Sequence, residues 1–187
     1  MSKKLIKVPY IDQTKEWPTG CESVSAVMLL QYLGMDISVE QFADFYLEKT
    51  PLLEKDGKLY GGDPRRVFVG NPADDQSMGC YAPVIKKAME KLFQEEAANP
   101  QKRQRKNKTA ESGACVKESA EPEKSGTAGE KVWEAVDLTG ISVEGLLRHY
   151  IDNDMPVIFW ASIDLKETYA GPEWIIADTG GVFEWRS

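Results

Sequence analysis

The sequence predicts an α+β domain, because its helical patterns come first along the chain and its strand patterns come last. Two capping boxes precede the first two helical patterns, and runs rich in β-branched and aromatic residues follow the fourth. A length of 187 residues fits a single domain. With 42% hydrophobic and 28% charged residues, the composition is that of a globular protein and excludes fibrous and wholly disordered classes.

The first helical pattern begins near Thr19 and is the most apolar. Thr19 and Glu22 have the spacing of a capping box, in which the threonine side chain caps the helix and the glutamate reaches back to it. Residues 24–30 are almost all apolar, which predicts a central helix buried on most of its sides. Gly34 follows as a typical helix end.

Three further helices are expected. Ser38 and Gln41 repeat the capping box and predict a second helix that continues to about residue 47. The third is expected over Pro83–Phe93, since proline is favourable in a first turn. Ser142 begins a fourth, whose apolar residues share one face at helical spacing. The members of this face are Val143, Leu146, Leu147, Tyr150 and Ile151.

The last quarter of the chain carries the strand signals. The run Pro156–Ile163 is short, apolar and rich in β-branched and aromatic residues, which predicts a buried strand. Glu173–Ile176 and Val182–Trp185 flank a Thr-Gly-Gly turn and predict a hairpin. Since the sequence stops soon after the second strand, we expect an incomplete C-terminal β-sheet. Its exposed edge and apolar surface would favour self-association.

Residues 94–131 differ from the rest of the chain, because they contain no aromatic residue and no leucine, isoleucine or methionine. Such a segment buries too little apolar area to offset its chain entropy. We therefore expect a disordered insertion within one domain that spans residues 1–187. The basic run at residues 102–108 has two interpretations, a docking patch or a solvated loop, and the tendency of charge runs to be solvated favours the loop.

Charge and composition also exclude several classes of partner. The chain has 23 Lys and Arg against 30 Asp and Glu, and the net charge of −7 argues against nucleic-acid binding. No signal peptide is visible, and no apolar run approaches the roughly 18 residues that a membrane span needs. A cytoplasmic location is the default. Three cysteines at irregular spacing suit neither a disulfide framework nor a zinc site, so no cofactor or metal is expected.

Cys21 is the sharpest candidate for chemistry. With Thr19 as the cap, Cys21 would lie in the first helical turn, where unpaired N–H groups and the helix dipole favour the thiolate. Gly20 would leave room for a substrate backbone. Gln13, eight residues upstream, would return its side-chain amide as an oxyanion donor. On these residues alone, a catalytic nucleophile and a buried structural cysteine are supported equally.

The other thiols and the histidine are weaker candidates. Cys80 lies near a helix start but has no capping box, so we expect a structural role. Cys115 falls within the predicted insertion. His149, the one histidine of the sequence, shares a helix face with Arg148 and Asp152, which predicts a surface residue rather than a catalytic base.

Several stretches of the chain, in order, resemble the cysteine peptidase family 39-like domain. VPYIDQ at Val8–Gln13 and WPTGCESVSAVMLLQYLG at Trp17–Gly34 are similar to its start. The remaining similar stretches cover most of the chain outside the insertion; they are GGDPRRVFVGNP (Gly61–Pro72), GCYAPVI (Gly79–Ile85), AVDLTG (Ala135–Gly140), PVIFWASI (Pro156–Ile163) and GPEWII (Gly171–Ile176). That family is related to bacterial peptidases that process bacteriocin leaders, and its fold is papain-like.

This resemblance implies a thiol hydrolase that cleaves a peptide or isopeptide bond of a peptide or protein substrate through an acyl-enzyme. Cys21 corresponds to the nucleophile and Gln13 to the oxyanion-hole glutamine, although the gap between them is longer than in the processing peptidases. The family also needs a histidine base on a strand after the hairpin, and the sequence stops before that point. The expectation is a C-terminally truncated domain, inactive as given. A non-catalytic peptide-binding domain and a truncated gene fragment are the alternatives.

Overall fold

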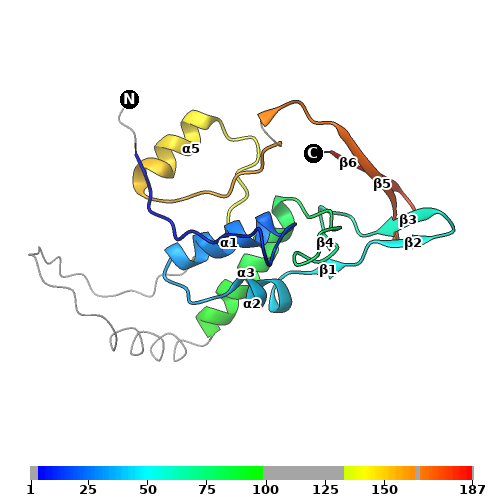
Figure 1. Ribbon diagram of the computed structural model, residues 1–187. Helices are drawn as coiled ribbons and strands as arrows, with labels where there is room; N and C mark the ends of the chain where they lie inside the picture. Colours follow the sequence, from blue (N-terminus) through cyan, green and yellow to red (C-terminus); the bar gives the residue numbers. More distant parts are fainter. Residues whose placement is uncertain (1–3, 99–132, 163–164, 187) are drawn as a thin grey trace, which may run out of the picture.

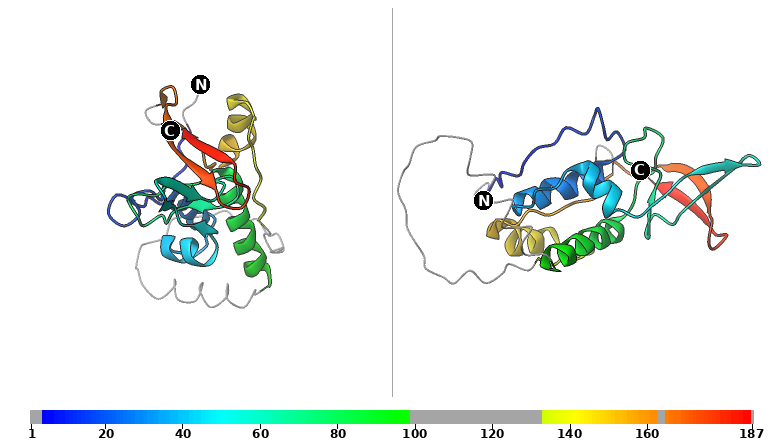
Figure 2. Two further views of the ribbon diagram at one scale, coloured as in Figure 1. Left: turned by 90° about the vertical axis from the view of Figure 1, so that its right-hand side faces the viewer. Right: turned by 90° about the horizontal axis from the view of Figure 1, so that it is seen from below.

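The computed structural model describes residues 4–98, 133–162 and 165–186. The helices are α1 (Cys21–Tyr32), α2 (Val39–Phe45), α3 (Ala82–Ala98), α5 (Val143–His149) and the 3₁₀ turn η1 (Ile151–Asn153). The strands are β1 (Lys49–Thr50), β2 (Leu53–Lys55), β3 (Lys58–Gly61), β4 (Phe68–Val69), β5 (Ala170–Ile176) and β6 (Val182–Arg186). The helices occupy one half of the molecule and the larger sheet the other, which confirms the predicted α+β class (Figures 1 and 2). The predicted order of helices first and strands last is wrong, because the short strands β1 to β4 lie between α2 and α3.

The start of α1 differs from the prediction. The helix begins at Cys21, and its N-cap is Gly20, which supplies no side-chain hydrogen bond. Thr19 does not cap the helix, because its hydroxyl donates to the carbonyl oxygen of Asp74 at 2.7 Å. The loop that contains Asp74 packs tightly against this helix end, and a Cβ on Gly20 would lie 3.0 Å from the Cβ of Pro72. A contact from a distant loop therefore replaces the predicted capping box.

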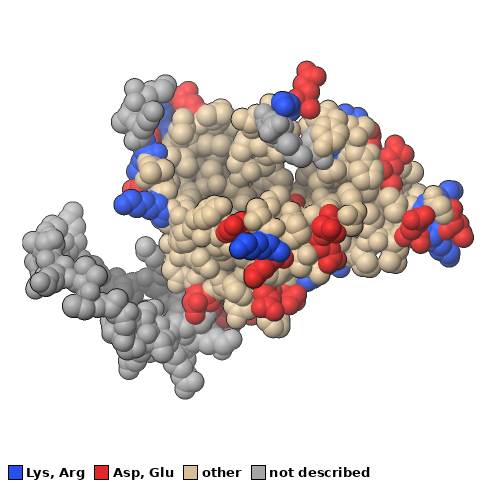
Figure 3. Space-filling view, viewed as in Figure 1, with Lys and Arg blue, Asp and Glu red and all other residues tan. Residues whose placement is uncertain are grey.

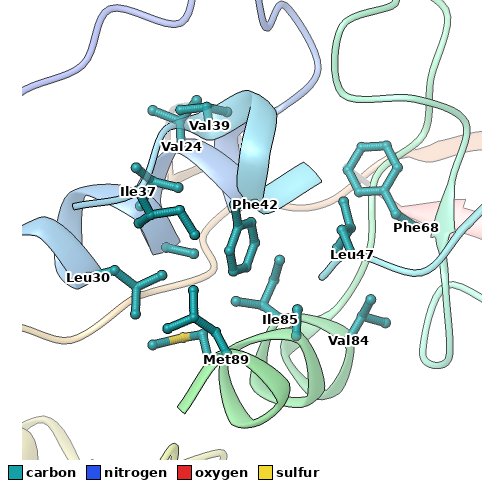
Figure 4. Close-up of a cluster of buried hydrophobic side chains, with 14 of the residues drawn as sticks. Val24, Leu30, Ile37, Val39, Phe42, Leu47, Phe68, Val84, Ile85 and Met89 are labelled. Atoms are coloured by element: carbon teal, nitrogen blue, oxygen red, sulfur yellow. The ribbon is translucent and has the colours of Figure 1, made fainter. Parts of the chain in front are cut away.

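The larger core lies where α1, α2 and α3 meet. Phe42 of α2 is fully buried and lies among Leu30 of α1 and Ile85 and Met89 of α3 (Figure 4). The buried residues along α1 are Glu22, Ser23, Val24, Ala26, Val27 and Leu30. The prediction of a central helix that is buried on most of its sides is thus confirmed.

Local signals located the other helix boundaries well. Gly34 follows α1 with φ +86°, a left-handed conformation that suits glycine at a helix end. Ser38 and Gln41 form the complete capping box of α2. The hydroxyl of Ser142 accepts a hydrogen bond from the Gly145 N–H at 3.1 Å and caps α5. Each of these motifs lies within a few residues of the chain, where no other element competes for its polar groups.

The third helix is longer than predicted. The sequence predicts a helix over Pro83–Phe93, but α3 continues to Ala98. The first five residues of the predicted insertion, 94–98, are therefore helical, because they extend a helix whose preceding turns are anchored in the core. Residues 99–131 of that segment, including Cys115 and the basic run, lie outside the described residues.

The predicted apolar face of α5 is not buried. Val143 is 71% exposed and Leu147 is 46% exposed, and no residue of this seven-residue helix is buried. Helical spacing places apolar residues on one face, but burial needs a second element packed upon that face. In the described part of the chain the helix chiefly contacts η1, which is too short to cover it.

The predicted strand at Pro156–Ile163 is wrong over its described residues, 156–162, which form no strand pairs. Its Ile158 and Trp160 side chains pack instead against the helical core. The Trp160 indole Nε1–H also donates to the carbonyl oxygen of Cys80 at 3.1 Å. The Ile158 and Trp160 side chains are only partly buried and Phe159 is 70% exposed, so the prediction fails for burial as well as for strand pairing.

The four-stranded sheet has the order β2-β3-β5-β6 and contains the predicted C-terminal hairpin. In this hairpin Trp174 pairs with Phe183 and Ile175 with Val182, in antiparallel register. Strand β3 pairs with β5 in parallel. Trp174 and Phe183 of the hairpin form a second, smaller core with Val69. Strands β2 and β6 are the two edges of this sheet. Self-association through β6 stays a prediction.

Candidate active site

Cys21 occupies the first position of α1 and is exposed, while the helix behind it is buried. Two elements shape this end of the helix. A tight turn holds Trp17 against Gly20, whose N–H donates to the Trp17 carbonyl oxygen at 3.0 Å. The loop at residues 71–74 covers the other side through Thr19. The result is an exposed cysteine at the first position of a buried helix, which is the placement expected of a helix-borne nucleophile.

The side chain next to this thiol is a buried carboxylate for which the sequence predicts a capping role. Glu22 is only 8% exposed. The Cys21 thiol donates a hydrogen bond to Glu22 Oε2 at 3.2 Å. The backbone N–H of Cys80, 58 positions away in the sequence, donates to Glu22 Oε1 at 2.9 Å. Glu22 therefore links the candidate nucleophile to the segment that precedes α3.

This carboxylate reverses the expected ionisation of Cys21. The sulfur lies against a buried group although the residue as a whole is exposed, and this desolvation together with the negative charge of Glu22 raises the pKa of Cys21 to about 12. A helix N-terminus contributes typically 0.3–1 kcal/mol, which is less than one pKa unit. Burial beside a carboxylate therefore outweighs the dipole. The predicted lowering of the Cys21 pKa is not seen.

Glu22 also responds to its surroundings. Burial raises the pKa of its carboxyl group, and the hydrogen bond from the Cys80 N–H opposes that rise. Sequence reasoning missed this residue as part of the site. The available signal was an acidic residue directly after the candidate cysteine, and local capping offered a simpler explanation for it.

Residues 79–81 form a wall of the site, on the side of the Glu22 carboxylate that faces away from α1. Cys80 is 1% exposed within the helical core, in agreement with the structural role predicted for it, and burial raises the pKa of its thiol well above the ordinary value. Its N–H is bound by Glu22 and its carbonyl oxygen by Trp160. The next N–H, of Tyr81, donates to the Pro64 carbonyl oxygen at 2.8 Å. The backbone of this wall is therefore held by hydrogen bonds to the Glu22 and Trp160 side chains and to the Pro64 backbone, in three separate parts of the chain.

Gly79 makes the close contact of this wall with Glu22 possible. Its φ is +97°, and a Cβ at this position would lie 2.3 Å from Glu22 Oε1. A side chain would therefore be strained by the backbone conformation and would also overlap the carboxylate. The chain needs glycine here because the backbone passes directly over the Glu22 oxygen.

Gln13 lies in the turns that lead into α1. Its carbonyl oxygen accepts a hydrogen bond from the Trp17 N–H at 2.9 Å, and the Trp17 carbonyl oxygen accepts one from Gly20 at 3.0 Å. These two turns fold the chain back between Gln13 and the helix start. The Gln13 side chain is half-buried. Its role as an oxyanion donor to a group on Cys21 stays a prediction.

His149 is exposed, as predicted, and lies at the other end of α1 from Cys21. Its carbonyl oxygen accepts a hydrogen bond from Asn153, and the adjacent Asp154 carbonyl oxygen binds the hydroxyl of Tyr32 at 2.6 Å. Tyr32 is the last residue of α1, whose 12 residues span about 18 Å. Figure 1 shows α5 beside this C-terminal end. The structure therefore does not bring the histidine to the thiol.

A surface pocket of about 320 Å³ lies near the start of α1. Two of its lining residues, Asn71 and Asp74, also accept hydrogen bonds from Thr19, two positions before Cys21. The full lining comprises Lys49, Pro51, Leu52, Gly70, Asn71, Asp74, Gln76 and Ser77. In the view of Figure 3 the surface is also hollowed above α1, and the walls of that hollow are mainly uncharged.

No helix in the described ranges is long and apolar enough to cross a bilayer.

Comparison with known proteins gives one family. The family model described as the Peptidase_C39 like family matches residues 5–112 of the 187, a range that includes Gln13, Cys21, Glu22 and Cys80. No curated protein matches the sequence.

One similar solved structure is that of a candidate C39-like peptidase from Bacillus anthracis, with 31% sequence identity and a TM-score of 0.41. The match covers 47% of this chain and 43% of that protein, so this chain spans less than half the length of the peptidase it resembles. Because the family model alone covers more than half of the sequence, this protein belongs to the Peptidase_C39 like family.

Proposed function

We propose that this domain is a cysteine-peptidase centre with Cys21 as its nucleophile and Gln13 as its oxyanion donor, in a papain-like arrangement around α1. The observation that carries the proposal is the placement of Cys21, an exposed residue at the first position of a buried helix, within the range matched by the peptidase family. The substrate is a peptide or protein, and the bond cleaved is a peptide or isopeptide bond.

In this reaction the Cys21 sulfur attacks the carbonyl carbon of the substrate, and the Gln13 amide donates to the oxygen as it becomes negative. The C–N bond then breaks, the amine leaves with a proton, and water hydrolyses the thioester. Attack and departure of the amine need a group that takes the thiol proton and delivers it to the amine, and hydrolysis needs the same group to take a proton from water and return it to the sulfur. His149 lies at the far end of α1, so we propose that the chain as given does not turn over peptides without a histidine brought in from elsewhere.

A peptide chloromethyl ketone tests the nucleophile without requiring turnover. In a Cys115→Ser background, we expect a covalent adduct on Cys21, found by peptide mapping, that is lost in Cys21→Ala and kept in Cys80→Ala and His149→Ala. Because the pKa of Cys21 is about 12, the rate should rise roughly tenfold per pH unit from pH 7 to 10 without levelling off. Labelling of Cys80 before Cys21 would contradict the assignment.

A non-catalytic peptide-binding domain is the second candidate, and the raised pKa of Cys21 favours it. At pH 7 a thiol with a pKa of about 12 is almost wholly protonated, so it reacts slowly. A binding domain would keep a reversible affinity for the peptide part of the probe in Cys21→Ala and form no adduct in the unaltered chain. An adduct in the unaltered chain would instead favour the peptidase centre.

A further inference from the structure

Glu22 is a buried titratable group beside the candidate nucleophile, and the proposed reaction does not use it. Its two carboxylate oxygens bind two neutral donors, the Cys80 N–H and the Cys21 thiol. It forms no ion pair with another residue of the described ranges. A buried carboxylate is costly unless its charge is compensated, so an unpaired one beside a candidate nucleophile calls for an explanation.

The surroundings hold this carboxylate in place. Gly79 leaves no space above Oε1, and the Cys80 N–H that binds the same oxygen belongs to a peptide segment fixed on its other side by Trp160. Glu22 itself belongs to the first turn of α1, directly after Cys21. Two rigid elements therefore keep Oε2 within hydrogen-bonding distance of the sulfur.

We propose that Glu22 is a positioning residue that keeps Cys21 as a protonated thiol in the resting domain. Oε1 accepts a hydrogen bond from the Cys80 N–H, and Oε2 accepts one from the Cys21 thiol, which keeps its proton. Ionisation of the thiol would then place two negative charges side by side in a partly buried site, so the nucleophile is restrained until the charge of Glu22 is compensated. The consequence for catalysis rests on the proposed function, whereas the ionisation of the thiol does not.

Few other charges act at this point. The titratable groups that face one another are Cys21 and Glu22 of α1 and Cys80 of the opposite wall. The remaining wall segment contributes Trp160, which carries no charge. A change in the ionisation of Cys21 on altering Glu22 can therefore be assigned to that carboxylate.

The test is the pH dependence of Cys21 alkylation by iodoacetamide, followed by peptide mapping of the full chain in the Cys115→Ser background. Glu22→Gln retains an oxygen for the Cys80 N–H but removes the negative charge. We expect alkylation of Cys21 at pH 8 to become at least about tenfold faster, with the whole rate profile moved to lower pH by about one unit or more. Glu16→Gln, at an exposed residue of the loop before α1, is the matched control for loss of one charge and should leave the rate unchanged.

A purely structural role for Glu22 would give a different result. Glu22→Gln would then lower stability and leave the alkylation profile of the folded protein within twofold of the unaltered chain, which would overturn the proposal. Glu22→Asp should restore slow alkylation in part, because it retains the charge on a shorter side chain. A moved profile without any adduct from the peptide probe would keep this inference and reject the proposed function. Adduct formation with an unmoved profile would do the reverse.

Discussion

Replacing Gly79 by alanine should lower the free energy of unfolding by about 3 kcal/mol, measured by urea denaturation. Gly79 has φ +97°, and the left-handed region costs other residues about 1–2 kcal/mol. The new Cβ would also lie 2.3 Å from Glu22 Oε1, and overpacking of this kind costs about 1–3 kcal/mol. Both costs add because the backbone cannot move away without breaking the Cys80 hydrogen bond.

Gly34→Ala is the matched control for this substitution. Gly34 has a similar φ of +86°, but a Cβ there would meet nothing within 4 Å, so only the backbone cost of about 1 kcal/mol should appear. In the double variant Gly79→Ala with Glu22→Ala, the overlap is removed, and the combined loss should fall short of the sum of the two single losses by at least about 1 kcal/mol. Equal losses for the two glycine variants would show that Glu22 does not press against Gly79.

Replacing Trp174 by alanine should cost about 3–5 kcal/mol of unfolding free energy. The side chain is 1% exposed and forms the centre of the smaller core, with its ring 5.0 Å from that of Phe183. Its indole Nε1–H also donates to the Gly62 carbonyl oxygen at 2.9 Å, and that oxygen would lose its partner. The loss therefore combines a cavity with an unpaired polar group.

Val182→Ala is the control on the same hairpin. Val182 is 68% exposed, so its truncation should change the free energy of unfolding by no more than about 0.5 kcal/mol. Trp174→Phe should give an intermediate loss, since it restores much of the volume but not the hydrogen bond to Gly62. A loss below about 1 kcal/mol for Trp174→Ala would mean that the hairpin contributes little to the stability of the domain.

Features that depend on neighbouring residues could be predicted from the amino-acid sequence. The capping box of Ser38 and Gln41, the cap at Ser142 and the C-terminal hairpin all follow from signals within a few positions. The motif around Cys21 also indicates the peptidase family, and it lies within the range that the family model matches. Local capping and turn preferences decide such features because no distant group offers their polar atoms a better partner.

The chemistry around Cys21 and the burial of some apolar segments depend instead on tertiary contacts. Thr19 and Glu22 have the spacing of a capping box, but their actual partners are Asp74 and Cys80, each more than fifty positions away in the sequence. A cap contributes about 1 kcal/mol, whereas a carboxylate taken out of water without a donor costs more, so the distant partners prevail. Apolar content alone likewise did not show that residues 156–162 would pack without strand pairing or that the α5 face would stay exposed. These outcomes depend on which element packs alongside, and sequence spacing does not contain that information.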